Sequence, residues 1–399
     1  MTEKQQRILA LFVIAMGVGL GCWWFLRIWT LHPNGMSIVS GKLPEWDFTN
    51  VWSGGTLASQ GKLATLFDAH AYQAWWQEQF GVAKKGSEWS YPPSLLLLAA
   101  PLSLLPIVWS YILWTLGGLA GVFAALKRNA LPVTVGAAAV LSTGAFNNMS
   151  FGQTGALTAA LLLGGLLAAG RRPILAGVLF GLLTIKPQMG LLVPVCLIAS
   201  GNWRAFAAAA ATSLALIAAS GLIFGWDAWG QFFTKTMPMM RAILEAPYPE
   251  TYQRNGVTVF LTARAAGAGL VVAYGAQFLA AGAAAGLAWM VWRRNDVDAA
   301  VGAGFTACLS LLATPYAYSY DMVAYSAAVA ILLWRADWRM SPYLMAAWLW
   351  PEFVAATNDH FPVTPFVVGM TAWMAWRALA PGEAALSAQT AGTDRSPAT

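Results

Sequence analysis

The sequence predicts an all-α integral membrane protein, a bundle of transmembrane helices. Hydrophobic residues make up 58% of the 399 residues, and the mean hydropathy is +0.57. Charged residues make up only 10% of the chain, against roughly 25% in a soluble domain. Because a spanning helix takes about 20 mostly apolar residues, the chain has room for roughly a dozen. This composition excludes an ordinary soluble enzyme, a disordered chain, a coiled coil and a disulfide scaffold.

The basic residues predict the orientation of these helices. Lys4 and Arg7 precede the first apolar run, so the N-terminus is expected in the cytoplasm. Later basic clusters follow every second apolar stretch, which predicts twelve crossings with both termini inside. The second crossing is expected as one helix broken by Pro101 and Pro106. The expected crossings are 8–29, 93–126, 131–147, 153–169, 173–186, 188–200, 203–224, 256–292 (its start a short surface helix), 298–314, 318–334, 341–357 and 362–378.

Two outer segments and a tail complete the expected organisation of the chain. Residues 30–92 form a long first outer loop, and residues 225–255 form a second one. Residues 381–399 are small and polar, and they are expected to be a disordered cytoplasmic tail. Residues 1–380 are therefore one polytopic membrane domain. The net charge of +6 is spread along the chain in ones and twos, so no nucleic-acid partner is expected.

The first outer loop is expected to contain interfacial helices. Residues 46–59 and 66–80 have the apolar spacing of amphipathic helices. Within the second of these, Trp75, Trp76 and Phe80 are expected at the level of the lipid headgroups, where interfacial aromatic residues lie.

The polar residues that are not topology anchors concentrate at the expected outer ends of the helices. This distribution predicts a functional site that faces outwards, with a membrane lipid as an expected partner. The residues are Asp47, Asn147, Asn148, Gln153, Lys186, Tyr316, Tyr318, Tyr320, Asp321, Asp359 and His360.

Lys186 is exceptional, because a lysine at an outer turn opposes the positive-inside trend. One interpretation is a side chain that snorkels to the membrane surface. The other is an anion site for a lipid phosphate, with Pro187 fixing the turn.

Asp47 also has two interpretations. It directly precedes the helical pattern 48–57, so its carboxylate is a candidate N-cap that accepts backbone N–H bonds. The functional interpretation is a general base that takes a proton from an acceptor hydroxyl. The two roles are compatible, since a capped aspartate is also an oriented one.

The aromatic and acidic residues near 320 are either an aromatic belt or part of a site. Asp321 favours a site, because a carboxylate that enters a membrane helix is costly without a partner or a wet cavity. Tyr91 is followed by Pro92 and Pro93, which end an interfacial segment and begin a helix.

Known chemical motifs are missing from the sequence. It contains no P-loop, dinucleotide fingerprint, HExxH or GxSxG motif. The three cysteines lie in apolar runs and the histidines are scattered, so neither a disulfide nor a metal site is expected, and no cofactor is expected.

Taken in order, several motifs resemble glycosyltransferase family 87, the bacterial family of proteins like polyprenol-phosphate-mannose-dependent mannosyltransferases. The resemblance covers roughly residues 8–378. The motifs are Asp47 in a long first loop, Trp52-Ser53-Gly54-Gly55 with Leu66-Phe67-Asp68, Ser90-Tyr91-Pro92-Pro93, Gly152-Gln153, Ile185-Lys186-Pro187, and Thr314-Pro315-Tyr316 with Tyr320-Asp321.

The resemblance implies a GT-C fold, a bacterial plasma-membrane location and a site on the outer face. The implied donor is a sugar, most simply mannose, on a polyprenyl phosphate, and the acceptor is a glycolipid or glycan. Asp47 matches the family's catalytic base, and Lys186 matches its Lys-Pro element. Characterised relatives carry a histidine near the motif at 316–321, where this sequence has none, so sugar and acceptor stay open.

The remaining roles combine the resemblance with the expected positions of the residues. Lys186 and Arg254, the latter from the second outer loop, are expected to bind the donor phosphate. The expected sugar and acceptor contacts are Tyr91, Asn147, Gln153, Tyr316, Tyr320 and Asp321.

Two other classes of function stay open. A transporter or lipid flippase explains the helices, but it predicts charged or broken helices at mid-membrane. A membrane scaffold without catalytic activity is the other alternative.

Overall fold

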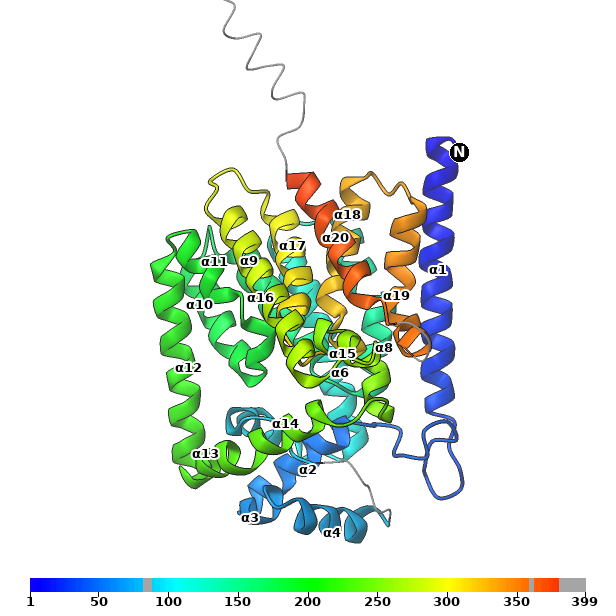
Figure 1. The fold of residues 1–399 in the computed structure, drawn as a ribbon. Coiled ribbons are helices and arrows are strands. Elements are labelled where there is room, and N and C mark those ends of the chain that lie inside the picture. Colours follow the sequence, from blue (N-terminus) through cyan, green and yellow to red (C-terminus); the bar gives the residue numbers. More distant parts are fainter. Residues whose placement is uncertain (82–87, 359–361, 380–399) are drawn as a thin grey trace, which may run out of the picture.

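The computed structural model describes residues 1–81, 88–358 and 362–379, and helices are the only regular elements in these residues. Most of the helices run roughly parallel and form a bundle, while shorter helices lie across one of its ends (Figure 1). The predicted all-α class is therefore confirmed. The predicted tail at 381–399, and Asp359 and His360, lie outside the described residues.

The bundle helices correspond to the predicted apolar stretches, with a few shifts in their bounds. They are α1 (Glu3–Ile28), α5 (Leu96–Leu102), α6 (Ile107–Arg128), α7 (Val133–Val140), α8 (Thr143–Phe151), α9 (Gly155–Ala168), α10 (Pro173–Leu182), α11 (Val193–Ala199), α12 (Trp203–Phe224), α15 (Val259–Ala265), α16 (Leu270–Trp292), α17 (Ala299–Ala313), α18 (Val323–Arg335), α19 (Pro342–Asn358) and α20 (Thr364–Leu379).

Four of these helices, α1, α6, α12 and α16, are long and apolar enough to cross a membrane by length and composition. The count of twelve crossings stays a prediction. The break expected in 93–126 is present, because α5 ends at Leu102 and α6 begins after Pro106. The expected helix at 131–147 is divided instead, since the Ser142 hydroxyl caps α8 by accepting the Ala145 N–H at 3.2 Å.

The bundle has an apolar exterior and a core of small residues. Outward residues of α12 and α16 are strongly exposed, such as Leu222 at 77% and Phe278 at 78%. By contrast, α17 and α18, which are rich in Ala, Gly and Ser, are almost wholly buried. Small side chains let helix backbones approach closely, which is how helices pack in lipid.

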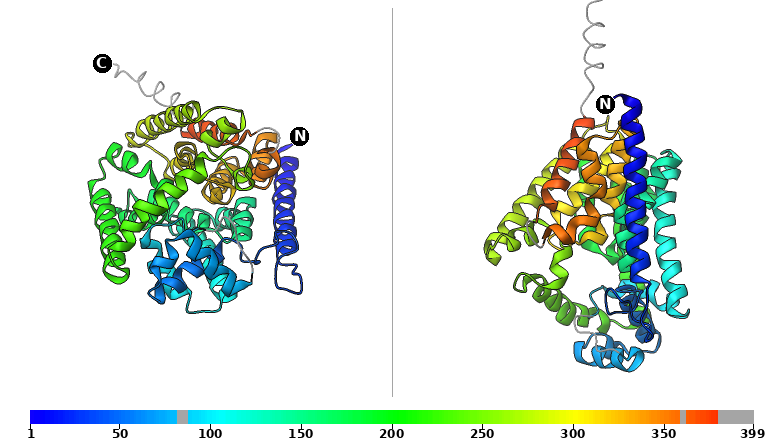
Figure 2. Two further views of the ribbon diagram at one scale, coloured as in Figure 1. Left: turned by 60° about the horizontal axis from the view of Figure 1, so that its bottom comes forward. Right: turned by 90° about the vertical axis from the view of Figure 1, so that its right-hand side faces the viewer.

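The predicted cytoplasmic anchors gather at one end of the bundle, called the basic end below. The beginning of α1 meets the α18–α19 connection there, where Arg339 Nη1 donates to Glu3 Oε1 at 2.9 Å. Arg7 pairs with Asp337 in the same contact. Nearby, Arg294 Nη2 donates to the carbonyl oxygen of Leu379, the last residue of α20, at 3.0 Å. The end of α20 and the beginning of α1 therefore lie on the same side (Figures 1 and 2).

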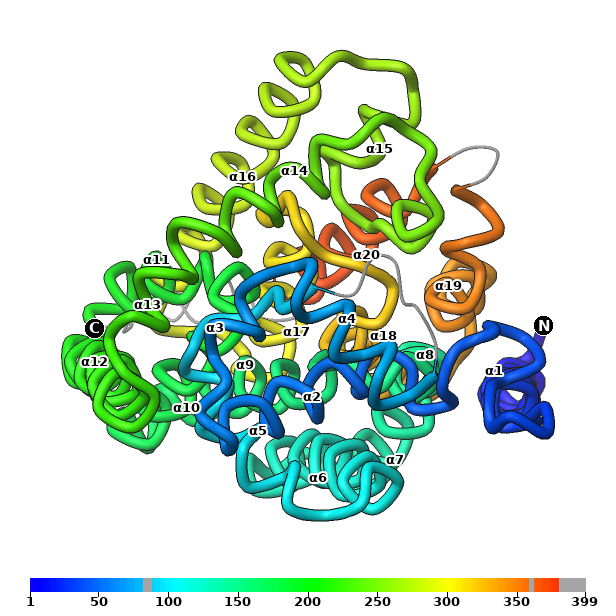
Figure 3. Tube along the Cα trace, turned by 90° about the horizontal axis from the view of Figure 1, so that it is seen from below, coloured from blue at the N-terminus to red at the C-terminus, as the bar shows by residue number. Residues whose placement is uncertain are grey.

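Two groups of short helices cover the opposite end, called the site end below (Figure 3). The first group is α2 (Phe48–Ser59), α3 (Leu63–Leu66) and α4 (Ala69–Phe80), which confirms the two helices predicted in the first outer loop. The second group is α13 (Asp227–Gln231), the π-helical turn η4 (Phe232–Thr236), α14 (Met237–Glu245) and the 3-10 turn η5 (Thr251–Asn255).

Of the three aromatic residues predicted to lie among the lipid headgroups, Trp75 and Trp76 are buried and do not face lipid, whereas Phe80 is half-buried. The two tryptophans are 8% and 3% exposed, respectively. The two rings pack against Tyr72 and Phe80, with a centroid distance of 4.8 Å between Trp76 and Phe80. The aromatic face of α4 is therefore used for packing inside the first outer loop and is not available to lipid.

Candidate active site

Asp47 is held at the site end by a tight contact between the loop before α2 and the end of α8. Its backbone N–H donates to the Phe151 carbonyl at 3.0 Å. Gly152 has a φ of 62°, and a Cβ on this residue would lie 2.5 Å from the Glu45 carbonyl oxygen. A residue with a side chain does not fit there. The close approach of the Glu45 carbonyl therefore explains why the Gly152-Gln153 motif has a glycine at its first position. Trp46, with a φ of 50°, packs on the Phe151 ring at 4.8 Å.

The N-cap interpretation of Asp47 is wrong in its chemistry, although Asp47 does precede α2. Its carboxylate accepts no backbone N–H from that helix. Instead, Asp47 Oδ2 accepts a hydrogen bond from Gln153 Nε2 at 3.1 Å. Among the described residues no hydrogen bond reaches the other carboxylate oxygen, Oδ1. One oxygen is thus oriented by the amide, and the other is available to a ligand.

Gln153 links Asp47 to Tyr91 in a chain that joins three separate segments. The Tyr91 hydroxyl donates to Gln153 Oε1 at 3.0 Å, while the amide nitrogen donates to Asp47. The backbone of Gln153 is fixed from α6, because Trp114 Nε1 donates to its carbonyl at 3.2 Å. With both ends of its amide engaged, Gln153 holds the carboxylate in one orientation.

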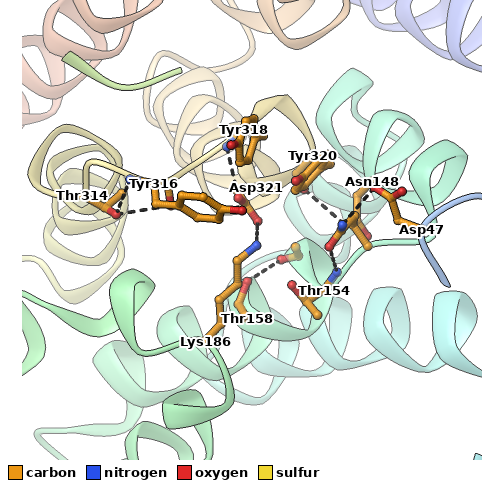
Figure 4. A network of polar contacts seen from close by, with 12 residues as sticks. Asp47, Asn148, Thr154, Thr158, Lys186, Thr314, Tyr316, Tyr318, Tyr320 and Asp321 are labelled. Atoms are coloured by element: carbon orange, nitrogen blue, oxygen red, sulfur yellow. Dashed lines mark hydrogen bonds and ion pairs between the residues drawn. The ribbon is translucent and has the colours of Figure 1, made fainter. Parts of the chain in front are cut away.

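Lys186 lies between two 3-10 turns, η2 (Leu183–Ile185) and η3 (Pro187–Gly190), and it forms a buried ion pair with Asp321. Lys186 Nζ donates to Asp321 Oδ1 at 2.5 Å, and the two side chains are 6% and 0% exposed, respectively. Figure 4 shows the pair with Tyr316 and Tyr320 beside it. The snorkelling interpretation of Lys186 is therefore wrong, because the ammonium group points into the protein.

Asp321 has the partner that its position was predicted to require. Its Oδ1 accepts from Lys186, and its Oδ2 accepts the Tyr318 backbone N–H at 3.1 Å. The lysine ammonium also lies 5.3 Å from the centre of the Tyr320 ring. Since a buried ion pair is favourable only when its remaining polar atoms are satisfied, these contacts fix both residues in the turn at 318–321.

Two asparagines of α8 form hydrogen bonds with the turn at 318–321. Asn147 Oδ1 accepts from the Ser319 hydroxyl at 3.0 Å. Asn148 Nδ2 donates to the Tyr320 carbonyl at 3.2 Å (Figure 4). Gly155 also faces that carbonyl, at a distance that leaves no room for a Cβ. Asn147 is only 8% exposed. Its contacts in the structure are thus with the chain itself.

A narrow polar crevice brings most of the predicted residues together. Its volume is 40 Å³, enough for a few waters, each of which needs about 10–15 Å³ on this measure. Met240, from α14, contributes to its wall. The lining residues are Ser90, Tyr91, Pro92, Gln153, Ile185, Lys186, Gln188, Met240, Tyr316 and Tyr320.

The other predicted residues surround the crevice without lining it. Asp47 reaches it through Gln153, and Asp321 reaches it through Lys186. Arg254 lies on η5 and is exposed, and its carbonyl accepts from Asn358 Nδ2 at 2.8 Å. That turn adjoins the site, because the Val257 N–H donates to the Ala317 carbonyl at 3.1 Å.

Sequence reasoning missed two residues of the site. Glu45 is 3% exposed, and its Oε2 has no hydrogen-bond partner among the described residues. Burial raises the pKa of this carboxyl above its usual value. An acidic residue two positions before Asp47 was the available signal. Met240 was missed because the sequence around it contains no signal that would indicate a contact with the crevice.

Comparison with known families identifies the class of protein. The model of glycosyltransferase family 87 matches residues 89–315, more than half of the chain. The chain therefore belongs to glycosyltransferase family 87, which confirms the resemblance and indicates a glycosyltransferase. The matched range includes Tyr91, Gln153, Lys186 and Arg254, while Asp47 and Asp321 lie outside it. No curated protein and no solved structure matches the chain.

Proposed function

We propose that the protein transfers a hexosyl group, most simply mannosyl, from a polyprenyl-phosphate donor to an acceptor hydroxyl on a glycolipid or glycan. A single observation carries this proposal. A carboxylate with one free oxygen, Asp47, and a buried cation, Lys186, are joined to one polar crevice from two sides. Sugar transfer from a lipid phosphate needs a base for the acceptor and a positive charge for the leaving phosphate.

The proposed reaction is a single displacement at the anomeric carbon. The acceptor oxygen forms a bond to that carbon, and its proton passes to Asp47. The bond between the anomeric carbon and the phosphate oxygen breaks, and both of its electrons leave with the polyprenyl phosphate. One displacement inverts the anomeric configuration, so one carboxylate suffices, whereas a retaining enzyme needs a second one as nucleophile.

Lys186 is proposed to stabilise the charge that grows on the leaving phosphate. Asp321 fixes the ammonium group in position through the ion pair. Arg254, on the exposed turn η5, is proposed as a second cation for that phosphate. Preorganised charges of this kind give the largest single contribution in many enzymes.

The sugar contacts are proposed for the residues that line the crevice: Tyr91, Gln153, Tyr316 and Tyr320. Asn147 and Asp321, which were expected to contact sugar, have their polar atoms engaged by Ser319 and Lys186. Their proposed role is therefore to position the turn at 318–321. The mechanism uses no metal or cofactor.

The proposed setting is the bacterial plasma membrane, with a GT-C architecture, twelve crossings and both termini in the cytoplasm. The support is the arginines that gather at the end where α1 begins and α20 ends. Arg7, Arg294 and Arg339 lie there, as the pattern of basic residues in the sequence predicts. By the positive-inside rule the site end then faces outwards, where a lipid-linked donor takes the place of a cytosolic nucleotide sugar.

The test is a transfer assay on purified protein in nanodiscs, with radiolabelled polyprenyl-phosphate-mannose and a bacterial membrane lipid extract as acceptor. A new mannosylated product and released polyprenyl phosphate are expected. Donors that carry other sugars follow if mannose is not transferred. Absence of product with every donor, together with movement of donor across the bilayer of reconstituted vesicles, would show a transporter instead.

A further inference from the structure

A second cavity at the site end lies outside the crevice. It has a volume of 280 Å³, close to the lower end of the range for ligand pockets, about 300–1,000 Å³. It opens between the two outer groups of helices, with α3 and α4 on one side and η4 and α14 on the other. The crevice, at 40 Å³, is much smaller.

The cavity and the crevice share two walls. Glu88 and Trp89 line the cavity, and the next residues, Ser90 to Pro92, line the crevice. In the second wall Met239 lines the cavity and Met240 lines the crevice. The two hollows are therefore neighbours, separated by one segment from each outer group.

The cavity is also connected to the helix that begins beside Asp47. Asn50, one turn further along α2, donates from Nδ2 to the Glu88 carbonyl at 3.0 Å. Its Oδ1 accepts from the Tyr72 hydroxyl at 2.5 Å. Both Tyr72 and Glu88 line the cavity. A ligand held there touches a wall that is hydrogen-bonded to the helix carrying the proposed base.

The lining of the cavity suits a saccharide. The carboxylates of Asp68 and Glu88 accept hydrogen bonds, and the ammonium of Lys235 donates them. The His70 imidazole does either. Tyr72 and Trp89 form part of the wall, but they are buried, at 0% and 2% exposed. Mixed donors and acceptors match the hydroxyl groups of a sugar. The wall that carries Lys235 is the π-helical turn η4, an irregularity that is frequent at functional sites.

We propose that this cavity binds the acceptor saccharide. The assignment rests on the proposed glycosyl transfer, which needs separate places for two substrates. The crevice beside Lys186 takes the phosphate side of the donor, and the larger cavity takes the acceptor. The acceptor hydroxyl then approaches the reacting carbon past the shared wall formed by Trp89 and Tyr91.

The experiment places a covalent label in the cavity. It then measures transfer to the acceptor and binding of the donor separately. His70, which is exposed, is replaced by cysteine (His70→Cys) in a Cys22→Ser background, in which the other two cysteines are buried. The protein is treated with benzyl methanethiosulfonate. Lys62→Cys is the matched control, because Lys62 is exposed on the same outer group but does not line the cavity. The readouts are transfer to the lipid extract and binding of radiolabelled polyprenyl-phosphate-mannose.

We expect the label on His70→Cys to lower transfer at least tenfold while donor binding stays within twofold. The same label on Lys62→Cys changes neither readout. In unlabelled protein, Lys235→Ala is expected to raise the acceptor KM at least threefold and leave the donor KM unchanged.

Three results would overturn the proposal. Full transfer by labelled His70→Cys shows that the cavity is not used. Loss of donor binding together with transfer assigns the cavity to the donor. Absence of transfer by the unlabelled Cys22→Ser protein with every donor would contradict the proposed function itself. The acceptor assignment, which rests on that function, would then fail as well. The unlabelled control therefore separates the two failures.

Discussion

The ion pairs of the basic end and the ion pair beside the crevice differ in burial. At the basic end the pairs are exposed: the side chains of Arg339 and Glu3 are 44% and 70% exposed, respectively. Beside the crevice Lys186 and Asp321 are 6% and 0% exposed, while the outer helix α14 carries an exposed pair, Arg241 with Glu245, at 74% and 21%. Exposed pairs each contribute about 0–1 kcal/mol, whereas removing one partner of a buried pair costs about 3–5 kcal/mol. The basic end thus uses several exposed pairs, whereas the crevice depends on one buried pair that is costly to break.

This contrast teaches where function is concentrated. In the proposed topology the charges of the basic end face the cytoplasm, and their exact partners matter little. At the site end each polar group holds the next, so a single substitution changes both geometry and chemistry.

The largest effect is expected for Asp47→Asn. An asparagine still accepts a hydrogen bond from Gln153 but does not take a proton, so transfer should fall by about 10²–10⁴-fold, the usual contribution of a general base. Thermal unfolding should not change. The control is Asp227→Asn, at an exposed aspartate of α13. Equal activity of Asp47→Asn and the unmodified protein would remove Asp47 from the mechanism.

The buried pair gives the next effect. Lys186→Met leaves the Asp321 carboxylate unpaired and should lower stability by about 3–5 kcal/mol. Adding Asp321→Leu removes the orphaned charge, so the double variant should recover most of the thermal stability. It should stay inactive, because the cation for the phosphate is missing. Recovery of transfer in the double variant would contradict the role of Lys186.

Substitutions of Gln153 test whether this residue orients the carboxylate of Asp47. Gln153→Leu removes a hydrogen bond to a charged group, worth about 1.5–3 kcal/mol, so kcat should fall on the order of tenfold to a hundredfold. Tyr91→Phe removes only the neutral bond at the other end of the amide and should have a smaller effect. If the two variants are equally impaired, Gln153 acts by contacting substrate and not by orienting Asp47.

Glu45 gives a pH-dependent effect on stability. Burial raises the pKa of its carboxyl, so the folded protein holds this proton more tightly than the unfolded chain does. That stabilisation is complete below the unfolded pKa and is lost as pH rises through the folded pKa. Glu45→Gln should therefore raise the thermal stability at pH 7, and the gain should vanish near pH 4.5. A gain that is constant across this range would point to packing instead.

The smallest effect is expected at the basic end. Arg339→Gln removes an exposed pair with Glu3 and should change stability by about 0–1 kcal/mol, less at high salt. Transfer should not change, because this pair lies at the opposite end from the crevice. A loss as large as that of Lys186→Met would refute the contrast between the two ends.

Sequence reasoning predicted the fold class, the break before Pro106 and the helices of the first outer loop, because apolar periodicity and proline act locally. It also predicted that Asp321 needs a partner, since an isolated charge in a membrane helix is costly. It did not predict that the partner is Lys186, because 135 residues separate them along the chain. Pairings of that separation depend on how the helices pack.

The inward packing of Trp75 and Trp76 escaped prediction for a related reason. An amphipathic aromatic face fits lipid and protein equally well, and the choice depends on which helix lies opposite. The cavity between α3 and α14 is a second example. It exists because two loops that are distant in sequence cover the same end of the bundle.

The most direct test of the central claim is the anomeric configuration of the product. The proposed reaction is one displacement assisted by one carboxylate, Asp47. Nuclear magnetic resonance of the purified product should therefore show the configuration opposite to that of the polyprenyl-phosphate donor. A retained configuration would require a covalent intermediate on a second nucleophile and would contradict the mechanism.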